Sequence, residues 1–236
     1  MKSIQKLILL TAFLIPALAM HAQTADEVIS KHIDAIGGKD VVSKVNSLYL
    51  ESNAQIMGND APNKTSILNG KGFKSETEFN GSTITQCYSD KSGWSTNPMG
   101  GSGAEAMPDE MYKQGKDQIY LPDPFFDYAA KGGKVELTGK EEANFKIKLT
   151  NADNIETTYF INSDTYQITK LIRKGNMMGN EVEITIKLSD YKKTDFGLAI
   201  PYTTEFDFGG QFSFTISVKK AEVNKTIDPA IFAMPK

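Results

Sequence analysis

Few side chains in this 236-residue chain have the types and spacing that catalysis or metal binding requires. His32 is the only histidine besides His21 in the N-terminal segment, so a metal site or a catalytic triad would lack partners. Asp123 and Asp127 flank Pro124-Phe125-Phe126 and could in principle form a catalytic carboxylate pair. Aspartates in such Pro-containing segments more often cap turns or helices. We therefore predict no catalytic residue, no metal site and no cofactor.

Two other features that could carry chemistry are equally weak. The run Gly-Gly-Ser-Gly at 100–103 lacks the lysine and Ser/Thr of a phosphate-binding loop, and no acidic segment has the spacing of an EF-hand. The single cysteine, Cys87, excludes an internal disulfide and a cysteine-built metal site. It lies in an expected strand, where a buried thiol acts as a small apolar side chain. The sequence therefore favours a binding protein over an enzyme.

The residues that stand out are apolar. Trp94, the only tryptophan, directly precedes a segment rich in Gly, Pro and Met that runs from Pro98 to Lys134. Methionine and aromatic side chains in such a segment can adapt to an apolar ligand of variable shape. They can equally be a permanent part of the core, and both interpretations remain open at this point. The residues concerned are Trp94, Met99, Met107, Met111, Phe125 and Phe126.

The first 22 residues have the layout of a secretory signal peptide, with a short basic head and an apolar run from Leu7 to Met20. This run is too short to span a bilayer comfortably. Cleavage after Ala19 or Ala22 is possible, and we slightly favour Ala22. No cysteine lies near the junction for lipid attachment. We therefore expect residues 1–22 to be removed and the rest to be exported and soluble; an uncleaved signal anchor is the alternative.

The charge of the chain argues against two classes of partner. The formal net charge is −3, and the mature chain, without Lys2 and Lys6, would have 24 basic and 29 acidic residues. A mildly acidic protein without a basic cluster is a poor candidate for nucleic acid or for an anionic membrane surface.

The hydrophobic pattern predicts a mainly β (α+β) domain. Residues 24–38 read as a helix with a capping box at Thr24 and Glu27, and a second helical segment is expected near 108–118. After Asn46 the apolar period changes to two, which is typical of strands. The pattern yields ten or eleven antiparallel strands without a βαβ rhythm. We therefore expect one large curved antiparallel sheet.

Several predicted strands have one apolar face, which needs a cover. The inward sets we expect are Val182, Ile184, Ile186 and Leu188 in one strand and Phe212, Phe214, Ile216 and Val218 in another. The first helix, with Ile29 and Ile33 on its underside, the Met/aromatic segment and the C-terminal turn could provide this cover. In that turn, Ile231 and Phe232 are expected to seal one end of the sheet.

Four stretches together resemble a known family: `ADEVISKHIDAIGGKD`, `SGWSTNPMGG`, `LSDYKKTDFGLAIPYTTE` and `AEVNKTIDPAIFAMPK`. Through them the mature chain resembles the periplasmic lipoprotein-carrier superfamily (LolA/LolB-like), in particular outer-membrane lipoprotein-sorting proteins of the Bacteroidetes type. The resemblance implies that residues 23–236 form a LolA-like half-barrel of about eleven strands, an incomplete barrel closed by helices over an apolar cavity. In the carriers, this cavity shields the acyl chains of lipoproteins.

The resemblance also implies a function, and the chain departs from the family at one residue. It implies a periplasmic carrier that binds an acylated lipoprotein or lipid, delivers it toward the outer membrane and has an envelope acceptor protein as partner. The ligand would contact Trp94, Met99, Met107, Met111, Phe125, Phe126, Ile29 and Ile33. Well-studied carriers hold the lid shut with a strand arginine, but the only arginine here, Arg173, lies well past that position. A module that senses envelope lipids without transporting them is the main alternative, and a secreted hydrolase is a more distant one.

Overall fold

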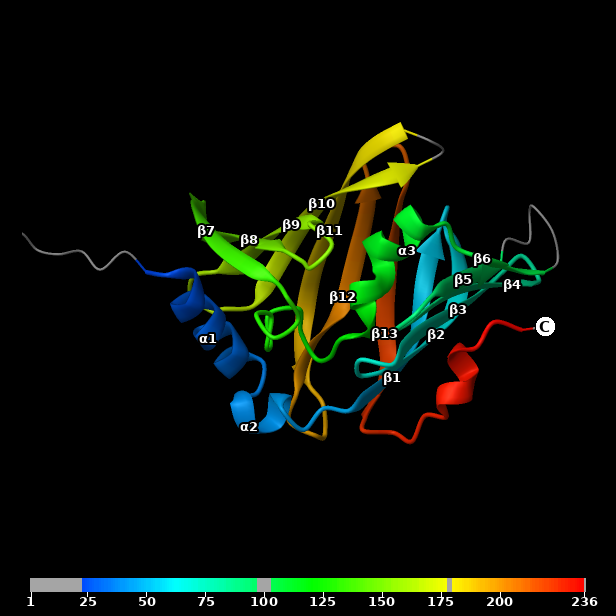
Figure 1. Cartoon of the computed structure of the whole chain (residues 1–236), viewed down its shortest axis with the longest axis horizontal. Helices are drawn as coiled ribbons and strands as arrows, with labels where there is room; N and C mark the ends of the chain where they lie inside the picture. The colour runs from blue at the N-terminus through cyan, green and yellow to red at the C-terminus, as the bar shows by residue number, and fades with distance from the viewer. Residues whose placement is uncertain (1–22, 97–102, 178–179, 236) are drawn as a thin grey trace, which may run out of the picture.

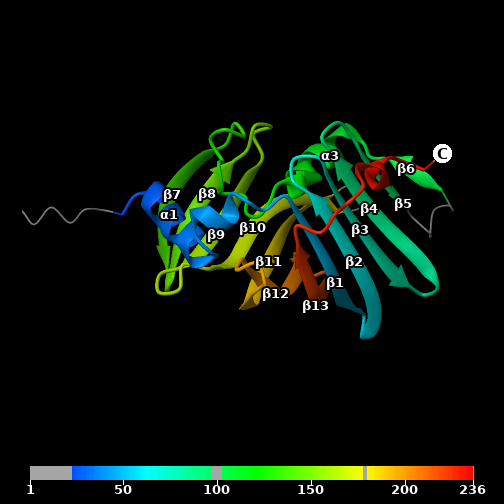
Figure 2. The same ribbon diagram turned by 90° about the horizontal axis from the view of Figure 1, so that it is seen from below.

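The computed structural model describes residues 23–96, 103–177 and 180–235, and its main element is one antiparallel sheet (Figure 1). The strand order is β6-β5-β4-β3-β2-β1-β13-β12-β11-β10-β9-β8-β7, so the first and last strands pair and β6 and β7 form the edges. The strands are β1 Ser47–Ile56, β2 Asn59–Leu68, β3 Gly72–Phe79, β4 Ser82–Ser89, β5 Gly93–Thr96, β6 Ala104–Ala106, β7 Lys134–Glu141, β8 Asn144–Thr150, β9 Glu156–Asn162, β10 Ile168–Met177, β11 Asn180–Lys193, β12 Ala199–Phe208 and β13 Ser213–Val223. Figure 2 shows how strongly the sheet curves.

In the described residues, five short helices accompany the sheet. They are α1 Ala25–Ala35, α2 Lys39–Val42, α3 Asp109–Gly115 and the 3₁₀ helices η1 Lys116–Ile119 and η2 Pro229–Phe232. The helical segment expected near 108–118 is thus present as two consecutive pieces, α3 and η1. In Figure 1, α1 lies at the β7–β9 end and η2 at the opposite end.

The predicted strand count of about eleven was wrong, because the structure has thirteen strands. One missed strand, β2, contains Pro62 and several polar residues, a composition that reads as a loop. Pro62 pairs with Asn53 of β1. The pairing of β2 with β3 begins only at the next residue, Asn63, so the missing N–H of Pro62 interrupts no bond between β2 and β3. The other missed strand, β6, has only three residues.

The apolar residues of the sheet form a continuous inner face. Residues directly opposite one another in neighbouring strands share a face of the sheet. One such row runs through Ile147, Tyr159, Leu171, Ile186, Phe206 and Phe214. The inward sets predicted on β11 and β13 lie on this face. Phe212 precedes β13 and packs beside Phe214.

Helix α1 covers the inner face at the β7–β9 end. Its predicted capping box is present, with Thr24 and Glu27 each bonding the other's backbone N–H. Ile29 and Ile33 are buried in the main core, which also contains Ile147 of β8. After the helix ends, the backbone carbonyl of Ile36 accepts a hydrogen bond from the N–H of Ala199, at the start of β12.

The C-terminal helix η2 lies on the outer face, not on the inner face for which it was expected. Phe232 packs against Cys87 and Trp94 and directly over Gly72, where any side chain would collide with its ring. Helix α3 packs on the inner face of the same strands, with Gly115 against the Tyr88 ring. Cys87 and Tyr88 are adjacent in β4, so their side chains point to opposite faces. The two helices therefore lie on opposite sides of the sheet.

Candidate functional site

A cavity of about 410 Å³ lies on the inner face, between strands β8–β12 and the segment from α3 to Gly133. This volume is within the range of pockets that hold one small ligand. We call the segment 109–133 the roof. The apolar side chains of the lining are Ile36, Leu149, Ile155, Ile168, Leu171, Ile186, Leu188, Ile200 and Phe206. The polar ones include His32, Gln114, Asp117, Gln118, Tyr120, Asp123, Tyr128, Lys131, Asn151, Thr157, Tyr159, Arg173 and Tyr191.

The roof is attached to the sheet by a few hydrogen bonds. The N–H of Gly70 donates to the carbonyl of Ile119 at 2.9 Å, and the N–H of Leu121 donates to the Asn69 side chain at the same distance. In α3, the Tyr112 hydroxyl donates to the carbonyl of Ser89 at 3.0 Å. These bonds fasten the roof to the loops on the β2–β5 side of the sheet.

On the other side of the cavity, Arg173 of β10 joins the roof to the floor. Its Nη1 donates to the backbone carbonyl of Gln114 in α3 at 2.9 Å. Among the described residues, no carboxylate lies within 4.0 Å of the guanidinium, and the buried Nε has no hydrogen-bond partner. Arg173 is therefore a cation in the cavity wall whose only hydrogen-bond acceptor is uncharged.

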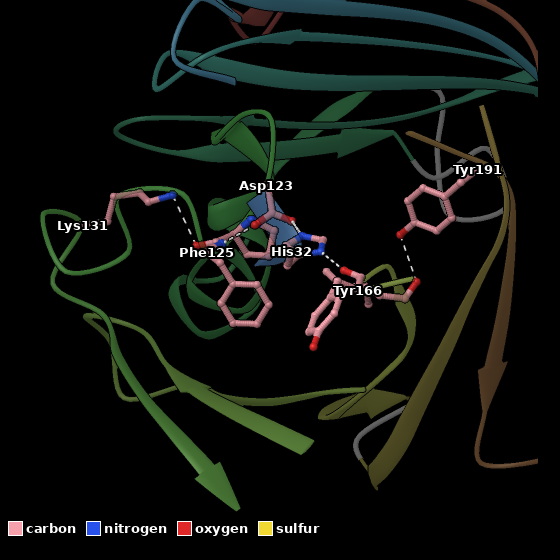
Figure 3. A network of polar contacts seen from close by, with 8 residues as sticks. His32, Asp123, Phe125, Lys131, Tyr166 and Tyr191 are labelled. Atoms are coloured by element: carbon pink, nitrogen blue, oxygen red, sulfur yellow. Dashed lines mark hydrogen bonds and ion pairs between the residues drawn. The ribbon is translucent and has the colours of Figure 1, made fainter. Parts of the chain in front are cut away.

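Two residues of the lining, His32 and Asp123, form a buried ion pair (Figure 3). His32 of α1 bonds the Asp123 carboxylate through Nε2 at 2.9 Å and the carbonyl of Tyr166 through Nδ1 at 2.7 Å. A carbonyl and a carboxylate both accept, so the geometry fits a doubly protonated imidazolium. Burial lowers the pKa of His32, but the Asp123 charge and the two hydrogen bonds outweigh it and raise the pKa above its ordinary value. Asp123 also accepts from the N–H of Phe125 at 2.7 Å, as expected of a turn cap.

Lys131, labelled in Figure 3, is a second cation of the lining. Its Nζ lies 3.4 Å from the Pro124 carbonyl and 5.0 Å from the centre of the Tyr120 ring. Burial lowers the pKa of this amine, and nearby carboxylates, Asp123 first among them, oppose the effect. On the β11 side, the Tyr191 hydroxyl donates to the carbonyl of Ile168 at 2.9 Å.

The eight residues predicted to contact a ligand are dispersed by the fold. Met99 lies outside the described residues, and none of the other seven is part of the cavity lining. Ile29 and Ile33 are buried in the core beneath α1, and Phe125, only 1% exposed, packs its edge on Tyr159 at 4.7 Å between ring centres. Phe126 is partly buried against the same core.

Trp94 and the two described methionines lie at the far end of the sheet. Trp94 is on the outer face, where its Nε1 donates to the carbonyl of Phe232 at 2.9 Å. Met107 packs on the inner face over Gly93, and Met111 in α3 is 51% exposed. Met107 therefore lies directly before the roof and Met111 within it, whereas Trp94 belongs to a separate apolar cluster.

Sequence reasoning missed the charged and aromatic lining. Lys131, Tyr159 and Arg173 come from a loop and two strands that are distant in the sequence, and no local motif connects them. One signal in the sequence could have pointed to this lining. Arg173 is the only arginine of the chain, and it follows Leu171 by two residues in the same strand. Alternation along a strand places these two residues on the same face.

The described part of the chain contains neither a group of possible metal ligands nor a helix that could span a membrane. No group of three or more His, Cys, Asp or Glu side chains could hold a metal ion there. None of the helices described for residues 23–96, 103–177 and 180–235 is long and apolar enough to cross a membrane.

No family model and no curated protein matches the sequence. Solved structures do match the fold. A domain described as an outer membrane lipoprotein-sorting protein from Vibrio parahaemolyticus has a TM-score of 0.59 and 10% identity, over 86% of this chain and 95% of that one. A DUF1329 family protein from Desulfovibrio piger has a TM-score of 0.58 and 15% identity, over 88% and 96%.

A LolA superfamily protein from Nitrosomonas europaea gives a similar match, with a TM-score of 0.58 and 10% identity over 89% of this chain and 97% of that one. Each of these comparisons covers at least 86% of this chain and at least 95% of the other chain, so the likeness concerns the fold as a whole. At these identities the similarity concerns architecture alone. The chain therefore has a LolA-like fold.

Proposed function

We propose that this protein is an exported, non-enzymatic carrier that binds acyl chains, free or attached to a lipoprotein, in the inner-face cavity. In this proposal, residues 1–22 direct export and are removed, and residues 23–236 act in the periplasm and deliver the ligand toward the outer membrane. The observation that carries the proposal is the cavity itself, which has a floor of aliphatic and aromatic side chains beneath a separate polar roof.

The physical reason is the cost of exposing an acyl chain to water. Each methylene that moves from water into an apolar environment contributes about 0.8 kcal/mol. Leu171, Ile186 and Phe206 stand side by side across three strands and offer a continuous apolar surface to such a chain. A carrier without energy input must also release its ligand, which requires a cover that opens.

The roof has the properties of such a cover. Its first part is the seven-residue helix α3 and the 3₁₀ turn η1, which are joined to the sheet and its loops by hydrogen bonds of Tyr112, Asp117 and Arg173 and by the Lys116–Asp153 ion pair. A local opening of α3 costs less than global unfolding, because it leaves the core contacts of Leu121 and Phe125 in place. We include Met107, which precedes α3, and Met111, which lies within α3, in the proposed entrance, and assign Phe125, Ile29 and Ile33 a supporting role behind the cavity.

Native mass spectrometry of the mature protein from its own cell envelope tests the proposal. Lipid or lipoprotein bound at near one-to-one stoichiometry is the expected result, and solvent extraction then identifies the ligand. Transfer of that ligand to acceptor vesicles distinguishes a carrier from a sensing module that retains it. A protein that is isolated empty and binds no acylated compound in solution would refute both.

A further inference from the structure

The polar part of the cavity contains an unusual charge arrangement around Arg173. Guanidinium groups in protein interiors ordinarily meet carboxylates, because removing an unpaired charge from water is costly. In the described residues no carboxylate lies within 4.0 Å of Arg173, and its buried Nε donates to nothing. One N–H of the guanidinium is used by the Gln114 carbonyl. The remaining donors have no partner of opposite charge.

The carboxylates of the same cavity are already engaged elsewhere. Asp123 is paired with His32 at 2.9 Å. Asp117 accepts a hydrogen bond from the Asn151 side chain at 2.6 Å and is exposed. Lys131, a second cation of the lining, forms no ion pair within 4.0 Å in the described part of the chain and contacts only the Pro124 carbonyl and the Tyr120 ring. The lining therefore has three cations, His32, Lys131 and Arg173, against the two carboxylates Asp117 and Asp123, which leaves one net positive charge.

The apolar surface begins directly beside the guanidinium. Leu171 and Arg173 project from the same face of β10, and their Cα atoms are separated by roughly 7 Å along an extended strand. Leu171 pairs with Ile186, which continues the apolar wall toward Phe206. A ligand that fits this arrangement has a charged oxygen-bearing end and an apolar chain attached to it. The volume of about 410 Å³ suits one such chain and not several.

We propose that the cavity selects single-chain anionic amphiphiles, with the carboxylate or phosphate head held by Arg173 and the chain lying along Leu171, Ile186 and Phe206. This inference rests on the proposed function, since it specifies which acyl compound the same cavity takes. Guanidinium groups bind both kinds of head by charge-assisted N–H bonds, which here come from the Nη atoms, because Nε is buried. An uncharged triacylated cysteine would leave Arg173 without its counter-ion.

Displacement of Nile red, an uncharged dye, from the delipidated mature protein tests the inference. The competitors are dodecanoate, dodecyl phosphate and dodecan-1-ol, which share one chain and differ in the head; inorganic phosphate alone tests the head without a chain. We expect the two anions to bind about tenfold or more tighter than the alcohol, which corresponds to one charged hydrogen bond. The anion of higher affinity identifies the head, and inorganic phosphate alone should not displace the dye.

Three variants separate the effect of the charge from an effect on the fold. Arg173→Gln keeps a donor but removes the charge, so it should reduce the preference for anions to about twofold or less while dodecan-1-ol still binds. Arg173→Lys should keep part of the preference. Lys174→Gln, at the exposed neighbouring position on the other face of β10, should keep all of it.

The possible failures are distinguishable. Equal affinity of the wild-type protein for dodecanoate, dodecyl phosphate and dodecan-1-ol would overturn the inference and leave the proposed function intact. An anion preference that persists in Arg173→Gln would overturn the role of Arg173. If no amphiphile displaces the dye or binds by calorimetry, the proposed function fails together with the inference.

Discussion

The guanidinium Nη1 of Arg173 lies 2.9 Å from the backbone carbonyl oxygen of Gln114, so a residue in the floor of the cavity holds the helix that covers it. The bond joins positions 59 residues apart in the sequence. It is a charge-assisted hydrogen bond near the end of α3, where the partial negative charge of the helix favours a cation. In our proposal, the side chain that holds the ligand head is therefore the same one that holds α3.

Replacing Arg173 by alanine should loosen the roof without unfolding the sheet. We expect faster amide hydrogen exchange in residues 109–119, corresponding to a loss of about 1.5 kcal/mol or more of local stability. Strand β1 should exchange as in the wild type. Lys174→Ala is the matched control, because Lys174 is exposed and its ion pair with Glu181 lies away from α3. Unchanged exchange in α3 would show that the bond to Gln114 does not hold the roof.

The C-terminal helix should contribute to stability but not to ligand binding. Phe232→Ala removes the ring that covers Gly72 and contacts Cys87 and Trp94, and it should lower the free energy of unfolding by about 3 kcal/mol. The Trp94 fluorescence should shift to longer wavelength as water reaches the indole. Urea unfolding measures the first effect, with Met234→Ala, an exposed position, as control. A large loss of ligand affinity in a folded Phe232→Ala protein would contradict the placement of this cluster outside the cavity.

The His32–Asp123 pair should make stability depend on pH. The pKa of His32 is raised in the folded protein, mainly by the Asp123 charge acting against burial, while an unfolded histidine titrates near 6.5. The stabilisation is therefore fully present below about pH 6.5 and is lost as the pH rises through the folded pKa. Urea unfolding between pH 6 and pH 9 should show this decline.

The variant His32→Gln is the control for this pH dependence. It should be less stable than the wild type at pH 6, because it leaves Asp123 buried without a cation, and its stability should decline less as the pH rises. A wild-type protein whose stability increases from pH 6 to pH 9, or a variant with the same decline, would contradict the assignment of a charged pair.

Met107, directly before the roof, and Met111, within it, should respond differently to a charge. Met111→Asp, at a position 51% exposed, should change the free energy of unfolding by less than about 0.5 kcal/mol and weaken binding of an acyl ligand. Met107 packs over Gly93, so Met107→Asp should destabilise the fold by about 2 kcal/mol. Denaturation and ligand titration of both variants check this. Unchanged ligand affinity in Met111→Asp would remove Met111 from the entrance.

The features that follow local rules were predictable from the sequence. The capping box of Thr24 and Glu27 marks the start of α1, and the alternating residues of β11 identify its inner face. Strand β2 was missed because Pro62 and its polar neighbours have the composition of a loop. The hydrophobic pattern of a strand indicates which of its residues are buried. It does not indicate which face of the sheet a distant segment covers, so η2 was expected on the inner face and lies on the outer one.

The cavity was less predictable than the fold. Met and aromatic composition pointed to the correct segment as cover, because α3 and η1 do form the roof. The composition could not show that Phe125 is a core residue or that Trp94 faces the outer side. The pairing of His32 with Asp123 and of Arg173 with Gln114 depends on tertiary contacts across 91 and 59 residues. No local period encodes such contacts.

The most direct test of the account is a pair of tryptophan substitutions at adjacent positions of β11. Leu188 lines the cavity, whereas Lys187 is exposed on the other face. Leu188→Trp should fill the cavity and reduce the affinity for dodecanoate at least tenfold, while Lys187→Trp should bind it as the wild type does, both measured by displacement of Nile red from folded protein. Equal binding of dodecanoate by the two variants would show that the inner-face cavity is not the ligand site.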